Sequence, residues 1–185
     1  MVSMSVPYRI AKRLAVPGGE APEHMHVTLA YLGKGLSPAQ LADAHRAVKA
    51  FARGCSSPIA AKLAGLGRFS ASETSDGRDV YHATVDAPTL PAARQQIVDC
   101  LKQLGVPVAA SHGFSPHVTL AYLHPDAPSP AHRMEPIDMQ CHGLHVITGN
   151  VRGAFYPFGD FRPPALVAKA LAPAEGAAVD ALLDA

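Results

Sequence analysis

Two short segments of this sequence carry residues that could perform acid–base chemistry on a phosphate ester. The letters HVTLAYL begin at His26 and recur without change from His117. Each copy holds a histidine and, two residues later, a threonine, which is Thr28 in the first copy and Thr119 in the second. Histidine exchanges a proton readily near neutral pH, and a pair can act as general base and general acid, each typically worth about 10²- to 10⁴-fold. The threonine hydroxyls can donate hydrogen bonds to the charged oxygens of a phosphate.

The repeated segment has the composition of a β-strand. Its residues are mostly β-branched, aromatic or aliphatic, and proline or glycine lies on either side. Successive strand residues point to opposite faces, so His26 and Thr28 share a face with a small alanine, while Val27 and its alternating neighbours form an apolar face. The second copy follows the same alternation. By this parity the tyrosines of the two copies, Tyr31 and Tyr122, are expected in the core or at the rim rather than in the site.

A long repeat that occurs twice predicts two similar halves, because a solenoid needs at least three units. If the halves pack about a pseudo-twofold axis, the two strands bring both histidines and both threonines to one shared cleft. This geometry suits attack by water, or by a neighbouring ribose hydroxyl, on a phosphodiester. The base and the acid must then lie on opposite sides of phosphorus, as two symmetry-related histidines would.

The composition is that of an ordinary globular protein. The chain has 185 residues, of which 48% are hydrophobic and 17% charged, and its net charge is +1 with neutral histidines. So small a charge argues against duplex DNA as a partner, because such binding rests on neutralising many phosphates; a small nucleotide or an RNA end is compatible. No apolar run could cross a bilayer and no secretory leader is recognisable, so no membrane partner is expected.

The cysteines indicate a reducing compartment. Cys55, Cys100 and Cys141 are odd in number and widely spaced, and no Cys-x-x-Cys is present. A disulfide framework or a structural zinc site is therefore not expected, and the cysteines are interpreted as free thiols. Together with the absence of a leader, this predicts a cytoplasmic protein, which we expect to be a monomer.

Hydrophobic periodicity predicts a mixture of strands and helices. Strands are expected at about 5–16, 24–32, 58–69, 80–85, 116–123, 137–148 and 154–158. Helices are expected at about 38–54 and 91–104, where apolar residues keep helical spacing between start and stop signals. Polar or proline-rich loops are expected at 70–79 and 125–136.

These elements predict one bilobal domain over residues 1–160 and a separate tail over residues 161–185. The tail is rich in alanine and proline. Any helix in it would be too short to be stable alone in water, so disorder and docking onto the body both remain open. We assign it no chemistry.

Weaker candidates for contacting a substrate are His24, Arg68, Arg78, His82 and Phe114. His24 is expected at the cleft rim; a metal site there is not expected, because no acidic or cysteine ligand has suitable spacing. His82 could line the cleft from a neighbouring strand. The two arginines flank the polar loop and could hold a second phosphate or a base, although solvated charges are commoner there. Phe114 could stack on a base, although core packing is the commoner role of such a residue.

The pattern His-x-Thr on two strands resembles the signature of the 2H phosphoesterase superfamily, which is the LigT-like or 2′-5′ RNA ligase family. The resemblance covers roughly residues 5–160 and includes the lead-in Phe114-Ser115-Pro116 before the second histidine. It implies an α+β fold of two lobes related by a pseudo-twofold axis, with antiparallel sheets flanking a central cleft and helices outside.

The same resemblance implies roles for the four motif residues. His26 and His117 would be the catalytic pair, Thr28 and Thr119 would bind the phosphate, and no metal or other cofactor would be required. Members of the family open 2′,3′-cyclic phosphates, ADP-ribose cyclic phosphate or 2′-5′ linkages. Some virus-encoded relatives hydrolyse cyclic nucleotide immune signals.

The sequence therefore predicts a metal-independent phosphodiesterase that acts on a cyclic phosphate or a 2′-5′-linked nucleotide, including a cyclic oligonucleotide signal. One alternative is an RNA 2′-5′ ligase, or a module that binds RNA ends or nucleotides in the same cleft without useful hydrolysis. Another is a structural protein in which the tail is the working part. The substrate and the division of base and acid roles between the histidines stay open at this point.

Overall fold

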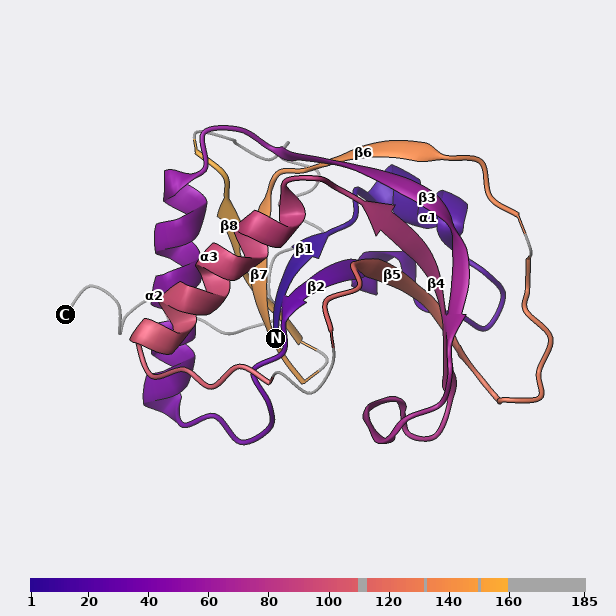
Figure 1. The fold of residues 1–185 in the computed structure, drawn as a ribbon, viewed down its shortest axis with the longest axis horizontal. Coiled ribbons are helices and arrows are strands. Elements are labelled where there is room, and N and C mark those ends of the chain that lie inside the picture. Colours follow the sequence, from indigo (N-terminus) through magenta and orange to yellow (C-terminus); the bar gives the residue numbers. More distant parts are fainter. Residues whose placement is uncertain (110–112, 132, 150, 160–185) are drawn as a thin grey trace.

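The protein folds around one antiparallel sheet of eight strands, which curls into a half-barrel (Figure 1). The computed structural model describes residues 1–109, 113–131, 133–149 and 151–159. The strands are β1 (Val2–Ser5), β2 (His26–Ala30), β3 (Ile59–Phe69), β4 (Asp79–Asp86), β5 (His117–Leu123), β6 (Ile137–Cys141), β7 (Gly143–Thr148) and β8 (Val151–Pro157). The helices are α1 (Tyr8–Leu14), α2 (Pro38–Gly54) and α3 (Leu90–Gln103), with short 3₁₀ turns η1 (Pro22–His24) and η2 (Glu73–Ser75).

The sheet consists of two four-stranded halves that meet at its centre. Its strand order is β6-β3-β4-β5-β2-β1-β7-β8, so the two repeat strands β5 and β2 are neighbours. Between them Val27 pairs with Val118, the same position in each copy of the repeat. The predicted α+β fold with two related halves is confirmed, and the two sheets are continuous through this junction.

The same irregularity interrupts both repeat strands. In the pairing of β1 with β2, consecutive residues of β1 face Thr28 and Ala30, which leaves Leu29 as an extra residue. In the pairing of β4 with β5, Leu120 is left out in the same way. Such a bulge bends the strand and re-aims the side chains that follow it. The alternation of faces expected along the whole repeat is therefore wrong beyond the bulge, and the residue this affects most is Tyr122.

The two long helices form as the sequence predicts. Ser37 caps α2 with a capping box in which its hydroxyl accepts from the backbone N–H of Gln40 while the Gln40 side chain accepts from the backbone N–H of Ser37. Helices α2 and α3 pack on each other and against β7, β8 and β2, on the side away from the β3–β4 hairpin (Figure 1). The apolar faces of these helices and the buried side chains of the strands form one hydrophobic core.

Two of the expected strands are wrong. Residues 5–16 do not form one strand: β1 ends at Ser5 and α1 follows, with Ala11 and Leu14 as its buried face at helical spacing. Residues 137–148 are divided at His142 into β6 and β7. These lie far apart in the sheet, because β6 pairs with β3 and β7 pairs with β1 and β8.

The tail predicted over residues 161–185 lies outside the described residues. Within the described part of the chain, no helix has the length and apolarity that a membrane span requires.

Candidate active site

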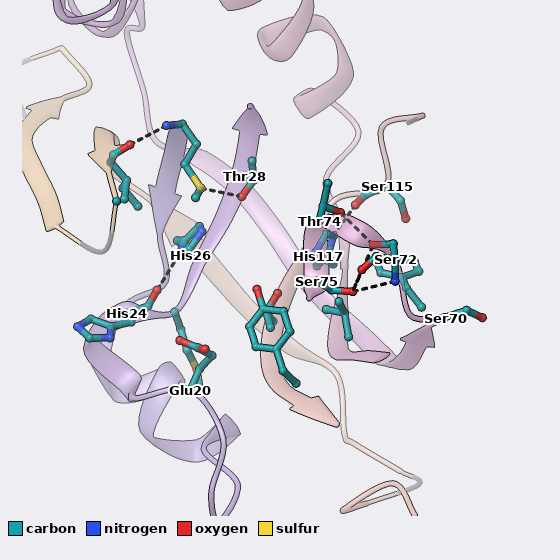
Figure 2. Close-up of a pocket in the computed structure, with 18 of the residues that line it drawn as sticks. Glu20, His24, His26, Thr28, Ser70, Ser72, Thr74, Ser75, Ser115 and His117 are labelled. Atoms are coloured by element: carbon teal, nitrogen blue, oxygen red, sulfur yellow. Dashed lines mark hydrogen bonds between the residues drawn. The ribbon is translucent and has the colours of Figure 1, made fainter. Parts of the chain in front are cut away.

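A cavity of about 800 Å³ lies where the two halves of the sheet meet, and all four residues of the two His-x-Thr motifs line it. His26 and Thr28 reach it from β2, and His117 and Thr119 reach it from β5. Figure 2 shows His26 and His117 on opposite sides of this space. The duplicated motif is thus brought to one shared cavity.

The register of the central strands interlocks the two motifs. Because β2 and β5 are antiparallel and Val27 pairs with Val118, His26 and Thr119 lie on one side of that pair along the strands, and Thr28 and His117 lie on the other. On each side of the pair, one repeat contributes an imidazole and the other repeat contributes a hydroxyl.

Both motif histidines are held in the same tautomer. The ring Nδ1 of His26 lies 2.7 Å from the carbonyl oxygen of His24, and that of His117 lies 2.7 Å from the carbonyl oxygen of Ser115. A carbonyl oxygen only accepts, so Nδ1 carries the hydrogen in each ring. In the neutral ring Nε2 is then the basic nitrogen, which is the atom that can exchange a proton with a ligand in the cavity.

The environment of His26 favours its neutral form. Burial lowers its pKa most, the hydrogen bond to the His24 carbonyl opposes this, and the positive charge of Arg152 lowers the pKa further. His26 therefore stays a free base to a lower pH than an ordinary histidine.

His117 is held by an aromatic pair. The ring of Phe69 stacks on the ring of His82, with centroids 3.9 Å apart and planes inclined by 20°. Both rings contact His117, at centroid distances of 5.0 Å from Phe69 and 5.3 Å from His82. His82 is buried, with 3% of its surface exposed, and its Nδ1 donates to the Val80 carbonyl oxygen. His82 therefore packs against the His117 ring and does not line the cavity, where it was predicted to lie.

Arg152 is a site residue that the sequence did not reveal. It projects from β8 into the cavity, and its guanidinium donates to Ser5 Oγ at 3.2 Å and to the Met25 carbonyl oxygen at 3.3 Å. Among the described residues that line the cavity, it is the one Lys or Arg side chain. No motif could have identified it, because it becomes a neighbour of His26 only through the pairing of β8 with β7 and of β7 with β1.

The structure places three of the weaker candidate residues in different environments. His24 is exposed at the cavity rim, where its carbonyl orients His26. Arg68 forms an ion pair with Asp79 at 2.6 Å and donates to three backbone carbonyls of residues 124–127, so it ties a loop down and does not line the cavity. Phe114 packs against the core with the Arg94 guanidinium over its ring.

Arg78 and Tyr122 lie together at one end of the cavity. The Arg78 guanidinium carbon lies 5.0 Å from the centroid of the Tyr122 ring, and Tyr122 lines the cavity. Tyr122 was expected in the core or at the rim; beyond the bulge at Leu120 its side chain lies instead on the same side of the sheet as Thr119.

No group of three His, Cys, Asp or Glu side chains in the described ranges is arranged to hold a metal ion. Among the groups that line the cavity are the two motif imidazoles, the two motif hydroxyls and the Arg152 guanidinium. These groups can move protons on two sides of a phosphate and stabilise negative charge on its oxygens.

The fold and the paired motifs define a phosphoesterase-like α+β protein with an internal duplication. The sequence profile of the 2′-5′ RNA ligase superfamily matches residues 13–152. The chain belongs to this superfamily, the LigT-like group of 2H phosphoesterases. No curated protein sequence matches it significantly.

Solved structures share the fold. The protein TT0787 of Thermus thermophilus is 19% identical, with a TM-score of 0.63 over 86% of this chain and 98% of that one. LigT of E. coli complexed with 3′-AMP is 16% identical, with a TM-score of 0.55 over 83% of this chain and 90% of that one. LigT of E. coli complexed with NADP⁺ is 14% identical, with a TM-score of 0.56 over 85% and 91%.

Proposed function

We propose that this protein is a metal-independent phosphodiesterase that opens a cyclic phosphate or cleaves a 2′-5′ linkage in a nucleotide. The observation that carries the proposal is the interlocked arrangement of the two motifs, in which His26 and His117 face one cavity in the same tautomer. A small nucleotide or an RNA end is the expected ligand, and a single guanidinium in the cavity matches one phosphodiester better than a polyanion.

In the proposed reaction, Nε2 of His26 takes a proton from a water molecule while the water oxygen forms a bond to phosphorus. The bond from phosphorus to a ribose oxygen breaks, and that oxygen takes the proton carried by Nε2 of His117. Thr28 and Thr119 donate hydrogen bonds to the non-bridging oxygens, and Arg152 offsets the charge that builds there. His26 is proposed as the base because its lowered pKa keeps it neutral.

Ligands of the fold relatives favour a phosphate on a ribose hydroxyl. LigT of E. coli has been crystallised with 3′-AMP and with NADP⁺. Both molecules carry a phosphate ester at a ribose hydroxyl, and opening of a 2′,3′-cyclic phosphate leaves such an ester. We therefore place 2′,3′-cyclic mononucleotides first among the substrates of this chain, with cyclic di- and oligonucleotide signals next.

The test is turnover in EDTA on 2′,3′-cyclic mononucleotides, 2′-5′ and 3′-5′ dinucleotides, and cyclic di- and trinucleotides. His26→Ala and His117→Ala should each reduce turnover by about 10²- to 10⁴-fold. His124→Ala is the matched control, because this exposed histidine lies on a loop outside the cavity. Full activity in both motif variants would overturn the proposal.

A second candidate is a 2′-5′ RNA ligase or a nucleotide-binding module, which the description of the superfamily favours. It would use the same cavity, so tight binding of a nucleotide without any product in the same panel would support it. Residues 1–160 contain every proposed site residue, and we propose that this segment carries the activity in either case.

A further inference from the structure

One end of the cavity carries an aromatic ring and a carboxylate that phosphate chemistry does not require. The ring is Tyr122, which is 38% exposed and has the Arg78 guanidinium over it. The carboxylate is that of Glu20, which points into the cavity (Figure 2). A carboxylate repels phosphate, so its place in this cavity indicates a different part of the ligand.

The backbone of Glu20, just before η1, is held against β5. Its backbone N–H donates to the Leu120 carbonyl oxygen at 2.7 Å, at the bulge that directs Tyr122 into the cavity. The residue before it, Gly19, has no room for a side chain, because a Cβ there would lie 2.3 Å from the same carbonyl oxygen. The bulge therefore places both Glu20 and Tyr122.

Both side chains line the same cavity. The charge of Glu20 contributes to a raised pKa of the Tyr122 phenol, for which burial is the larger cause. No side chain or backbone N–H of the described residues donates a hydrogen bond to the Glu20 carboxylate. Glu20 thus offers two acceptor oxygens in the cavity that the Tyr122 ring also lines.

The neighbouring hairpin adds hydroxyl groups to this end of the cavity. Val80 pairs with Tyr122, and Ser70 and Thr74 of the turn before it line the cavity (Figure 2). Ser75 is buried and its hydroxyl donates to the Arg78 carbonyl oxygen at 2.5 Å, which holds the turn in shape. This end of the cavity therefore has an aromatic ring on which a base can stack, hydroxyl groups that can hydrogen-bond a sugar, and the two acceptor oxygens of Glu20.

The two acceptor oxygens of the Glu20 carboxylate can distinguish one nucleobase from another. Guanine presents two adjacent N–H donors, N1–H and N2–H, on its Watson–Crick edge, which a carboxylate can bind with both oxygens. Adenine and cytosine present one donor beside an acceptor on that edge, and uracil one donor between two acceptors. We propose that Glu20 and Tyr122 form a nucleobase subsite that selects guanine, in which the base stacks on Tyr122 and donates to Glu20. This inference rests on the proposed function.

The first test compares kcat/KM for the 2′,3′-cyclic phosphates of guanosine, adenosine, cytidine and uridine. The wild-type protein should prefer guanosine by about tenfold or more, the discrimination typical of a bidentate contact to a base. Glu20→Gln should lower the guanosine value and raise the adenosine value, because an amide offers the donor and acceptor that adenine matches. An equal rise for all four bases would mean that Glu20 acts only by repelling phosphate, and would overturn the subsite.

The second test addresses stacking. Tyr122→Ala should weaken guanosine 3′-monophosphate binding, measured by calorimetry, by about 10- to 100-fold. Tyr122→Phe keeps the ring and loses only the phenol hydroxyl that hydrogen-bonds Thr119, so it should retain most of the binding. The matched control is Tyr31→Ala, since Tyr31 has the same place in the first repeat and similar exposure but does not line the cavity. Equal losses in the Tyr31 and Tyr122 variants would contradict the assignment.

The two proposals fail separately. If the wild-type protein cleaves all four cyclic nucleotides equally well, the phosphodiesterase stands and the guanine subsite falls. If it cleaves none but binds guanosine 3′-monophosphate in preference to the adenosine, cytidine and uridine analogues, the subsite stands and the hydrolytic activity falls.

Discussion

Val27 of the first repeat pairs with Val118 of the second at the centre of the sheet. Because the two strands are antiparallel, each side of this pair carries the histidine of one repeat and the threonine of the other. A phosphate held between the strands would therefore contact one imidazole and one hydroxyl from each half of the chain.

The threonine hydroxyls should contribute chiefly to the transition state. Thr119→Val keeps the shape of the side chain but removes the donor, and loss of one such donor typically costs about 10²- to 10³-fold in kcat. We expect a loss in this range with little change in KM, measured by steady-state kinetics. Thr84→Val is the control, because that hydroxyl donates to the Gly65 carbonyl oxygen outside the cavity.

The acid limb of the kcat/KM profile should lie below the ordinary histidine pKa of about 6.5. The proposed base His26 works in its neutral form, and burial lowers its pKa, so it stays neutral as the pH falls past that value. Activity should be retained on moving from pH 7.5 to 6.5 and should fall only at lower pH. A flat profile between pH 5 and 9, or an acid limb above pH 7, would contradict the assignment of the base.

Arg152 should affect both binding and the pH profile. Arg152→Met removes a positive charge that lowers the pKa of His26, so the acid limb should move to higher pH. It also removes the guanidinium that offsets phosphate charge, and we expect kcat/KM to fall by about 10- to 100-fold. Arg152→Lys keeps the charge, so its acid limb should stay near that of wild type. A loss of rate in Arg152→Met without movement of the limb would mean that the arginine does not act on His26.

His82 should act by positioning His117. His82→Ala leaves a void beside the His117 ring, so kcat should fall about tenfold while KM stays constant. His82→Phe retains a ring to stack on Phe69 and should recover most of the rate. Gly67→Ala should resemble His82→Ala, because a Cβ there would lie 2.7 Å from His82 Nε2 and would displace it. Thermal unfolding distinguishes loss of position from loss of fold.

His145 should make the folded state sensitive to acid. It is 1% exposed, and burial lowers its pKa from the ordinary value to about 4. Between about pH 6.5 and 4 the unfolded chain binds a proton that the folded protein does not, so the free energy of unfolding falls as the pH falls, by about 3 kcal/mol over that window. Urea unfolding at pH 7.5 and pH 5 measures this, and His145→Gln should show a smaller difference than wild type.

The repeat and its strand parity were enough to identify the four motif residues and the two-half architecture, and the helical spacing of apolar residues was enough to predict the long helices. These features depend on short-range patterns: a period of two along each strand places His26 and Thr28 on one face, and an N-cap serine followed by proline and by apolar residues at helical spacing defines α2. The break after Ser5 could not be read in the same way, because the apolar residues of α1 fit a strand as well as a helix over so short a segment.

The residues that surround the two motifs depend on which strands become neighbours in the sheet. Arg152 reaches His26 because β8, β7 and β1 are adjacent, and His82 supports His117 because β4 pairs with β5. Tyr122 enters the cavity because a bulge at Leu120 interrupts the alternation on which parity rests. Local sequence encodes the direction of a side chain within its own strand, whereas long-range pairing, whose stability comes from the packed sheet as a whole, decides what that side chain meets.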